Sequence, residues 1–227
     1  MNAFSQGPLV LLDLDGTLID SAPGIVASVA HAYGVLGLPV PAADVLRSFI
    51  GPPIATSFPA HGVPPERVAE AIAAYRAEYT RAGMRNQAVF DGIPGQLRRL
   101  REAGCVLAIA TSKPEVFAHP IAEQFGFPDL VDGVFGASLD ERGTKAGVIA
   151  NALVALGRSV ADAATAAPAL MVGDREYDVA GAREHGIDCL GVTWGYALPG
   201  ELEAAGCAAI IDDVGALAQT VLTLLRA

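Results

Sequence analysis

Two pairs of aspartates are the residues of this sequence whose type and spacing best suit chemistry. Asp13 and Asp15 end one apolar run, while Asp174 ends a second run and Asp178 follows one helical turn later. Carboxylates at the end of a buried strand are costly unless a cation offsets their charge, and a divalent metal ion would do so. Each pair alone could be a solvated strand end or a helix cap. The two pairs together predict a site that binds a divalent cation.

Polar residues at two further positions would complete a site that handles phosphate. Thr111 and Ser112 end the apolar run CVLAIATS. Hydroxyls and backbone N–H groups at a strand-to-helix turn suit the oxygens of a phosphoryl group. Lys145 stands near the start of an otherwise apolar helical stretch. Taken separately, the hydroxyls are equally typical of helix N-caps, and the lysine is typical of a solvated side chain.

The elements that must position these residues alternate short apolar runs with longer amphipathic stretches. Strands are predicted at residues 8–15, 105–112, 133–138, 169–174, 188–194 and 208–212. Helices are predicted between them at residues 94–103, 115–125, 144–157, 177–185 and 213–226. Near-continuous apolar strands are typical of sheets covered by helices on both faces. The pattern predicts an α/β fold with a Rossmann-like, doubly wound parallel sheet, whose C-terminal edge is the usual ligand site.

One gap interrupts this alternation, because about 90 residues separate the first predicted strand from the second. That is too long for a single crossover. Only helices are predicted there, at about residues 22–37, 41–49 and 65–82. We therefore predict an all-helical cap domain over residues 22–89, inserted into a core domain made of residues 1–21 and 90–227.

Composition narrows the class of protein and its partners. The chain of 227 residues has a formal net charge of −10 and a sequence pI near 4.7, which disfavours nonspecific binding to nucleic acid or to anionic membranes. Cys105, Cys189 and Cys207 form no CxxC pair, so neither a disulfide framework nor a zinc knuckle is predicted. A signal peptide or membrane span does not fit the first apolar run, because aspartates interrupt it. We expect a soluble cytoplasmic protein.

The motifs together resemble those of the haloacid dehalogenase superfamily. DLDGTLIDS (13–21) looks like its first motif, Thr111 its second, Lys145 its third and GDREYD (173–178) its fourth. The resemblance covers the whole chain. The helical insertion between the first two motifs, together with the WGY segment (194–196), looks like the phosphoglycolate-phosphatase-like subgroup.

This resemblance implies a role for each aspartate. Asp13 would be the nucleophile and would carry an aspartyl-phosphate intermediate. Asp15 would be the general acid/base, which protonates the leaving alkoxide and then activates water. Mg²⁺ would be bound by Asp13, by the backbone carbonyl of Asp15 and by Asp174, with Asp178 orienting ligands from just outside.

The resemblance also implies which groups bind the substrate. Thr111, Lys145 and backbone N–H groups near Gly16 or Ser112 would bind the phosphoryl oxygens. The cap would close over the site and recognise the leaving group, and Arg47 is its candidate contact. A solvated helix position is the alternative for Arg47. The Ala-rich stretch 159–168 is expected to be a helix end or a surface loop.

The activity implied is Mg²⁺-dependent hydrolysis of a small phosphomonoester, most like that of phosphoglycolate phosphatases. Asp15 favours phosphoryl transfer over dehalogenation, because a halide leaving group needs no proton. A 5′-nucleotidase-like or sugar-phosphate phosphatase and, further off, a β-phosphoglucomutase-like transferase are the alternatives within enzymes. A non-catalytic binding or signalling protein is the alternative outside them. The expected partner is a small phosphate ester, without nucleic acid or membrane, for a monomer or homodimer.

Overall fold

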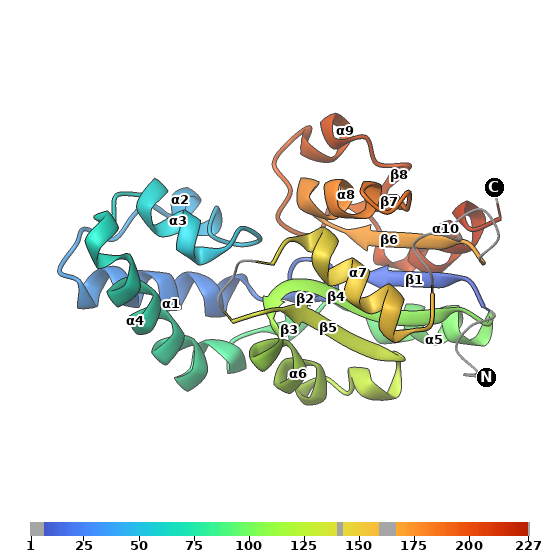
Figure 1. Ribbon diagram of the computed structural model, residues 1–227, viewed down its shortest axis with the longest axis horizontal. Coiled ribbons are helices and arrows are strands. Elements are labelled where there is room, and N and C mark those ends of the chain that lie inside the picture. Colours follow the sequence, from blue (N-terminus) through green and yellow to red (C-terminus); the bar gives the residue numbers. More distant parts are fainter. Residues whose placement is uncertain (1–6, 140–142, 159–166, 227) are drawn as a thin grey trace. The chain divides into compact units, whose positions relative to one another are not determined.

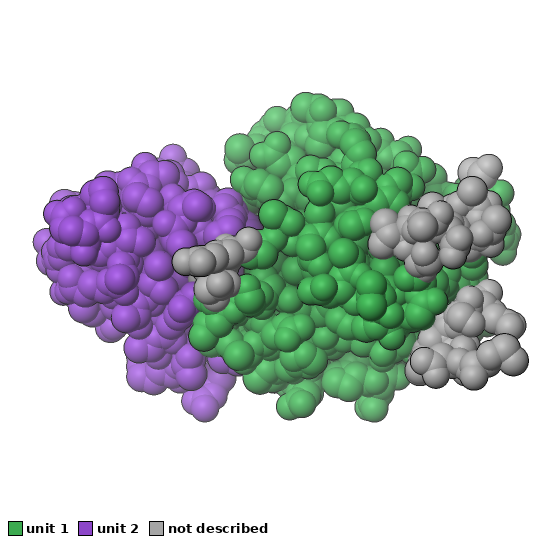
Figure 2. All heavy atoms as spheres, viewed as in Figure 1, with its two compact units in different colours: residues 1–18, 89–227 green, residues 19–88 purple. Residues whose placement is uncertain are grey.

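The computed structural model describes residues 7–139, 143–158 and 167–226 and divides into two compact units. The core unit comprises residues 1–18 and 89–227, and the helical unit comprises residues 19–88 (Figure 2). The helical unit thus begins at β2 (Ile19–Asp20), which pairs with β3 (Ala88–Val89), rather than at the helix that follows β2. Most of the Ala-rich stretch 159–168 lies outside the described residues.

A six-stranded sheet forms the centre of the core unit, with the order β5-β4-β1-β6-β7-β8 (Figure 1). Its strands are β1 (Leu9–Leu12), β4 (Val106–Pro114), β5 (Gly133–Ala137), β6 (Ala169–Gly173), β7 (Asp188–Val192) and β8 (Ala209–Ile211). All neighbouring pairs are parallel. The predicted α/β fold with a parallel sheet is confirmed. Because β1 lies between β4 and β6, the strand order changes direction there, which is where ligands bind in such sheets.

Helices of the core unit connect these strands and pack on the sheet. They are α5 (Ile93–Glu102), α6 (Glu115–Gln124), α7 (Lys145–Ala155), α8 (Glu176–Arg183), α9 (Glu201–Ala205) and α10 (Leu217–Leu224). The short helix α9 was not predicted. The predicted helix 213–226 begins instead with a 3₁₀ turn, in which the side chain of Asp213 accepts a hydrogen bond from the Gly215 N–H at 2.8 Å.

The helical unit contains α1 (Ala22–Val35), α2 (Ala43–Arg47), α3 (Ile54–Ala60) and α4 (Val68–Arg81). Helix α3 was not predicted, because Pro59 lies inside it and prolines precede it, and such residues usually indicate a turn. An aromatic cluster fills the interior of the unit; its members are Tyr33, Phe49, Phe58, Tyr75 and Tyr79. Among the described residues of the chain, no helix combines the length and the apolar character that a membrane crossing requires.

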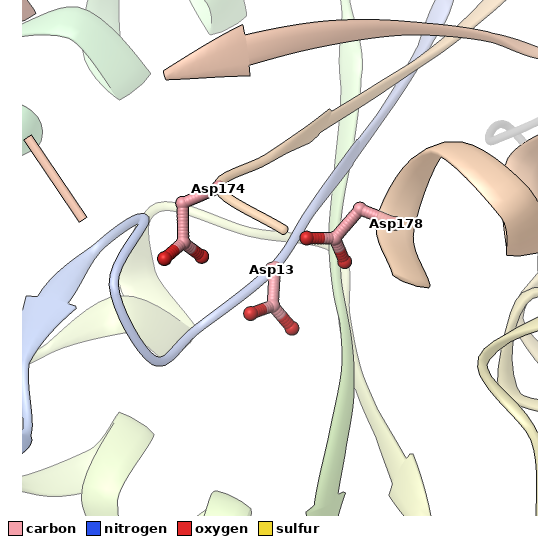
Figure 3. Close-up of side chains that lie close together, drawn as sticks. All are labelled: Asp13, Asp174 and Asp178. Atoms are coloured by element: carbon pink, nitrogen blue, oxygen red, sulfur yellow. The ribbon is translucent and has the colours of Figure 1, made fainter. Parts of the chain in front are cut away.

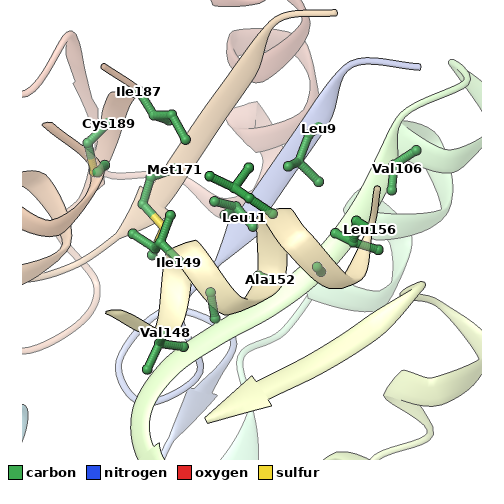
Figure 4. Close-up of a cluster of buried hydrophobic side chains, with 14 of the residues drawn as sticks. Leu9, Leu11, Val106, Val148, Ile149, Ala152, Leu156, Met171, Ile187 and Cys189 are labelled. Atoms are coloured by element: carbon green, nitrogen blue, oxygen red, sulfur yellow. The ribbon is translucent and has the colours of Figure 1, made fainter. Parts of the chain in front are cut away.

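An apolar cluster between the sheet and α7 positions the strand ends (Figure 4). Leu9 and Leu11 of β1 contribute to it, as do Ile149 and Ala152 of α7, and all four are fully buried. Burial of such side chains from both the sheet and the helix holds β1 beneath α7. The residues that follow β1 and those that begin α7 are therefore fixed relative to each other.

Leu11→Ala tests this cluster. The fully buried leucine leaves a cavity when truncated, so we expect the free energy of unfolding to fall by about 2–5 kcal/mol. Urea denaturation followed by circular dichroism measures it. Val154→Ala is the control, because that α7 side chain is 71% exposed and should change stability by less than about 0.5 kcal/mol. Equal effects of the two substitutions would contradict the assignment of the core.

Candidate active site

Three carboxylates converge where β1 and β6 end (Figure 3). Asp13 follows β1 directly, Asp174 follows β6 directly, and Asp178 lies in the first turn of α8. The two strands are neighbours, and the Asp13 N–H continues their ladder by donating to the Val172 carbonyl at 2.9 Å. One oxygen from each carboxylate lies within 4.8 Å of the others, and all three residues are buried. This acidic cluster has the oxygen donors that a metal ion requires.

Lys145 supplies the positive charge that contacts this cluster. Its Nζ lies 2.5 Å from Asp13 Oδ1 and 2.7 Å from Asp178 Oδ1, and the lysine side chain is only 5% exposed. The lysine is the first residue of α7, where the Thr144 side chain caps the helix by accepting from the Gly147 N–H at 3.1 Å. The solvated position that is typical of a helical lysine is therefore not what the structure has.

Asp174 is held by hydrogen bonds from two other segments. The Thr17 hydroxyl donates to Oδ1 at 3.2 Å, and the Tyr196 N–H donates to Oδ2 at 2.7 Å. Gly16, which has a φ of +84°, passes so close that a Cβ at this position would collide with the Asp174 carboxylate. Glycine is thus needed at position 16 both for its backbone conformation and for the close approach.

Burial and mutual repulsion set the protonation of these groups. Burial raises the pKa of Asp13 to about 6; Lys145 opposes that rise and Asp178 adds to it. Burial, with Asp178 and Asp13, also raises the pKa of Asp174 well above its usual value. Burial disfavours the charged form of Lys145, but Asp13 and Asp178 more than offset this and raise its pKa. Among the ion pairs of the described residues, Lys145 contacts two of the three carboxylates, those of Asp13 and Asp178, so the cluster and this lysine together have two negative charges (3 − 1 = 2) when all are ionised.

Asp15 lies apart from the acidic cluster and has its own cation. Lys113 Nζ lies 3.0 Å from Asp15 Oδ1 and 2.7 Å from Asp15 Oδ2, and the lysine side chain is 5% exposed. The backbone N–H of Lys113 donates to the Thr111 hydroxyl oxygen at 3.2 Å. At this edge Lys145 is therefore paired with Asp13 and Asp178, whereas Lys113 is paired with Asp15.

Lys113 was not predicted as a site residue, although one signal for it was present in the sequence. The chain contains only two lysines against 13 arginines, and the two lysines are Lys113 and Lys145. The structure adds that β4 extends to Pro114, beyond the predicted end at residue 112, and that its register against β5 is irregular between Ala110 and Pro114. Because lysine is rare in this chain, its presence at positions 113 and 145 indicates that these two positions require a lysine.

The remaining predicted site residues differ in burial and in the unit to which they belong. Thr111 is buried at the end of β4, Ser112 is half-buried beside it, and Gly16 lines Asp174. Arg47 is exposed and ends α2 in the helical unit. Its contact with the substrate remains a prediction. The carboxylate of Asp15 is outside the acidic cluster. Metal binding by its backbone carbonyl stays a prediction.

Comparisons with known proteins agree on the family. Residues 10–192 match the family model described as haloacid dehalogenase-like hydrolase. The tyrosine-protein kinase PtkA of Mycobacterium tuberculosis is 46% identical over 189 residues, which cover 83% of this chain. This match spans only 62% of the length of PtkA.

Relatives of similar length have phosphatase names. A 5′-nucleotidase of Pseudomonas aeruginosa is 38% identical and covers 94% of this chain and 95% of its own. A phosphoglycolate phosphatase of Cupriavidus necator is 32% identical over 92% of this chain and 90% of its own. The crystal structure of a predicted phosphatase from Clostridium acetobutylicum superimposes with a TM-score of 0.87 at 38% identity, covering 96% of this chain and all of that one.

The raised pKa of Asp13 predicts that the free energy of unfolding of the metal-free protein falls as the pH rises. A carboxyl whose folded pKa of about 6 exceeds its unfolded value favours folding below about pH 4, and this contribution is lost as the pH rises through 6. We expect Asp13→Asn to raise the melting temperature in EDTA by several degrees more at about pH 7.5 than at about pH 4.5. Differential scanning calorimetry measures this difference. Asp188→Asn, at an exposed position of β7, is the control and should show no such difference between the two pH values.

Proposed function

Because this chain belongs to the haloacid dehalogenase-like hydrolase family, we propose that it hydrolyses a small phosphomonoester through a phosphoaspartate formed on Asp13. One observation carries the proposal. Asp13 and Asp15 lie at the same sheet edge, yet each has its own buried lysine partner, Lys145 and Lys113 respectively. Two carboxylates in separate environments can take separate roles, one as nucleophile and the other as acid and base.

Mg²⁺ is the proposed cofactor. The acidic cluster fits a divalent cation, because it consists of oxygen donors and, when all three carboxylates are ionised, has two negative charges more than Lys145 offsets. Asp13, Asp174 and the backbone carbonyl of Asp15 would bind the ion, with Asp178 beside them. When bound, Mg²⁺ would offset the negative charge of the phosphate and of the nucleophile.

In the first step, a carboxylate oxygen of Asp13 forms a bond to phosphorus, and the bond from phosphorus to the leaving oxygen breaks. Asp15, protonated at the start of this step, gives its proton to that oxygen, so the product leaves as an alcohol. Lys145 and the Thr111 hydroxyl bind the phosphoryl oxygens and stabilise the charge that spreads over them.

In the second step, Asp15 takes a proton from water as the water oxygen attacks phosphorus. The bond between Asp13 and phosphorus breaks, inorganic phosphate is released, and both aspartates return to their starting states. Because Asp15 acts in both steps, its position affects both rates. General acid/base catalysis of this kind contributes about 10²–10⁴-fold.

The substrate is proposed only to the level of its class. The names of relatives suggest phosphoglycolate and nucleoside 5′-monophosphates as candidates. Both are small phosphomonoesters, and sugar phosphates are a third candidate of the same class. The helical unit, with Arg47, is the proposed source of selectivity among them. A cytoplasmic setting is supported by Cys105, Cys189 and Cys207, which are all free thiols.

A second candidate function, protein-tyrosine kinase activity, follows from the similarity to PtkA. In this candidate function, a tyrosine hydroxyl accepts the phosphoryl group instead of water. Asp13 would again form the bond to phosphorus, now to the γ-phosphorus of ATP, and ADP would leave. In the second step Asp15 would take the proton of the tyrosine hydroxyl as its oxygen attacks phosphorus and the bond to Asp13 breaks. Hydroxylamine separates the two cases, because it cleaves an acyl phosphate and leaves phosphotyrosine intact. Label from [γ-³²P]ATP that persists in hydroxylamine would favour the second candidate.

The function is tested by phosphate release from 2-phosphoglycolate, nucleoside 5′-monophosphates, sugar phosphates and p-nitrophenyl phosphate. We expect at least one natural substrate with kcat/KM of about 10⁴ M⁻¹s⁻¹ or more in Mg²⁺, and none in EDTA. Asp13→Asn should abolish turnover, whereas the exposed Asp188→Asn should not change it. Turnover that persists in EDTA or in Asp13→Asn would contradict the proposed mechanism.

The role of Lys113 gives a second kinetic prediction. Lys113→Met removes the ammonium beside Asp15, so we expect kcat for an alkyl phosphate to fall about 10²-fold through misplacement of that carboxylate. p-Nitrophenolate needs no proton to leave, so p-nitrophenyl phosphate should still phosphorylate Asp13 quickly. Only the hydrolysis of the resulting phosphoaspartate should be slow. Stopped-flow absorbance should then show a stoichiometric burst followed by slow turnover.

The control for Lys113→Met is Arg99→Met, which removes an exposed cation from α5 and should leave kcat unchanged. If Lys113→Met kept wild-type kcat on both substrates, Lys113 would have no part in holding Asp15.

A further inference from the structure

The segment that follows β7 forms a wall of the acidic cluster. Trp194 Nε1–H donates to the Thr17 carbonyl at 3.1 Å, and the Tyr196 N–H donates to Asp174 Oδ2 at 2.7 Å. A Cβ on Gly195 would collide with the Asp174 carboxylate and with the Gly16 carbonyl, so the segment is packed directly against both. Its position therefore determines the surroundings of Asp174.

Glu201, at the start of α9, connects this segment to residues 174–178, which lead from the end of β6 into α8 and are called the aspartate loop below. Its Oε2 accepts from the Leu198 N–H at 2.8 Å. Its Oε1 accepts from Arg175 Nε at 2.7 Å and from the Glu176 N–H at 2.9 Å. One carboxylate thus joins residues 198 and 201 to residues 175 and 176, which lie between Asp174 and Asp178 in the chain.

A local turn accounts for only half of these contacts. Leu198 and Glu201 close a turn before α9, because the Glu201 N–H also donates to the Leu198 carbonyl at 3.0 Å. This turn needs no more than Oε2. Both partners of Oε1 are 25 or 26 positions earlier in the chain, so this oxygen serves the aspartate loop.

The contact between Arg175 and Glu201 is shielded from water, which makes its loss costly. The arginine side chain is 12% exposed and the glutamate side chain is 8% exposed. Burial alone would raise the pKa of Glu201, but the Leu198 N–H, Arg175 and the Glu176 N–H hold it below its usual value. A neutral side chain at position 201 would leave the Arg175 charge without this partner.

The aspartate loop has a further contact of its own. The Arg175 N–H donates to Asp178 Oδ2 at 3.1 Å, while Asp178 Oδ1 contacts Lys145. Residue 175 therefore connects Glu201, through its side chain, to Asp178, through its backbone. Asp174 is contacted by the 194–198 segment, through the N–H of Tyr196.

We propose that Glu201 is a positioning residue for the metal site: it joins the 194–198 segment to the 174–178 loop and so holds Asp174 and Asp178 ready for Mg²⁺. This inference rests on the proposed function, because it takes the acidic cluster to be a Mg²⁺ site. Groups that orient metal ligands from behind typically change metal affinity by about 10–100-fold when they are removed.

Glu201→Gln tests the proposal, with Mg²⁺ affinity measured by isothermal titration calorimetry. We expect Mg²⁺ to bind about 10–100-fold more weakly, because the amide cannot accept from all three donors. At saturating Mg²⁺, kcat and KM for p-nitrophenyl phosphate should return to near wild-type values. Glu203→Gln is the matched control, because Glu203 lies on the same helix with an exposed side chain, and its Mg²⁺ affinity should equal that of wild type.

The outcomes separate this proposal from the proposed function. Wild-type protein that binds no Mg²⁺, or binds it as well after Asp174→Asn, would contradict the metal site itself. Mg²⁺ affinity unchanged in Glu201→Gln, with a wild-type metal site intact, would overturn the role of Glu201 alone. Should Glu201→Gln fail to fold by circular dichroism, Glu201→Asp retains the charge on a shorter side chain, and the same weakening is expected of it.

Discussion

Lys145 holds the carboxylates of Asp13 and Asp178 at 2.5 and 2.7 Å, and the rest of the sheet edge is arranged around this contact. Asp13 follows β1, whereas Lys145 and Asp178 lie in the first turns of α7 and α8, so their meeting requires the sheet order that places β1 beside β6. The apolar cluster beneath α7 fixes the start of that helix, and with it the position of the ammonium. The core thus determines where the charge lies.

The same contact leaves the site short of positive charge. Asp174 adds a third buried carboxylate with no ammonium of its own among the described ion pairs; hydrogen bonds from Thr17 and Tyr196 hold it instead. Buried like charges destabilise a folded protein, and here they also create affinity for a cation. Stability and function therefore have opposite requirements at this edge, as is common in active sites.

The sequence was sufficient to predict the six strands and the four motif segments, because apolar runs and chain order determine which strand ends can meet. It did not predict Lys113, since the contact of this lysine with Asp15 joins residues that are 98 positions apart in the chain. It missed Glu201 for a similar reason: the Oε1 contacts cross 25 or 26 positions and leave no periodic signal. Helices α3 and α9 were missed because they are short and lie among prolines and glycines. Long-range polar contacts were thus harder to predict than the fold.

A phosphoryl group carried by Asp13 is the central claim, and its most direct test is to trap it. Enzyme mixed with p-nitrophenyl phosphate and Mg²⁺ should be quenched in acid within a single turnover, digested and analysed by mass spectrometry. We expect the peptide containing Asp13 to gain the mass of one phosphoryl group and to lose it in hydroxylamine. Phosphate released in the same turnover with no modified peptide, or a modification on any other residue, would contradict it.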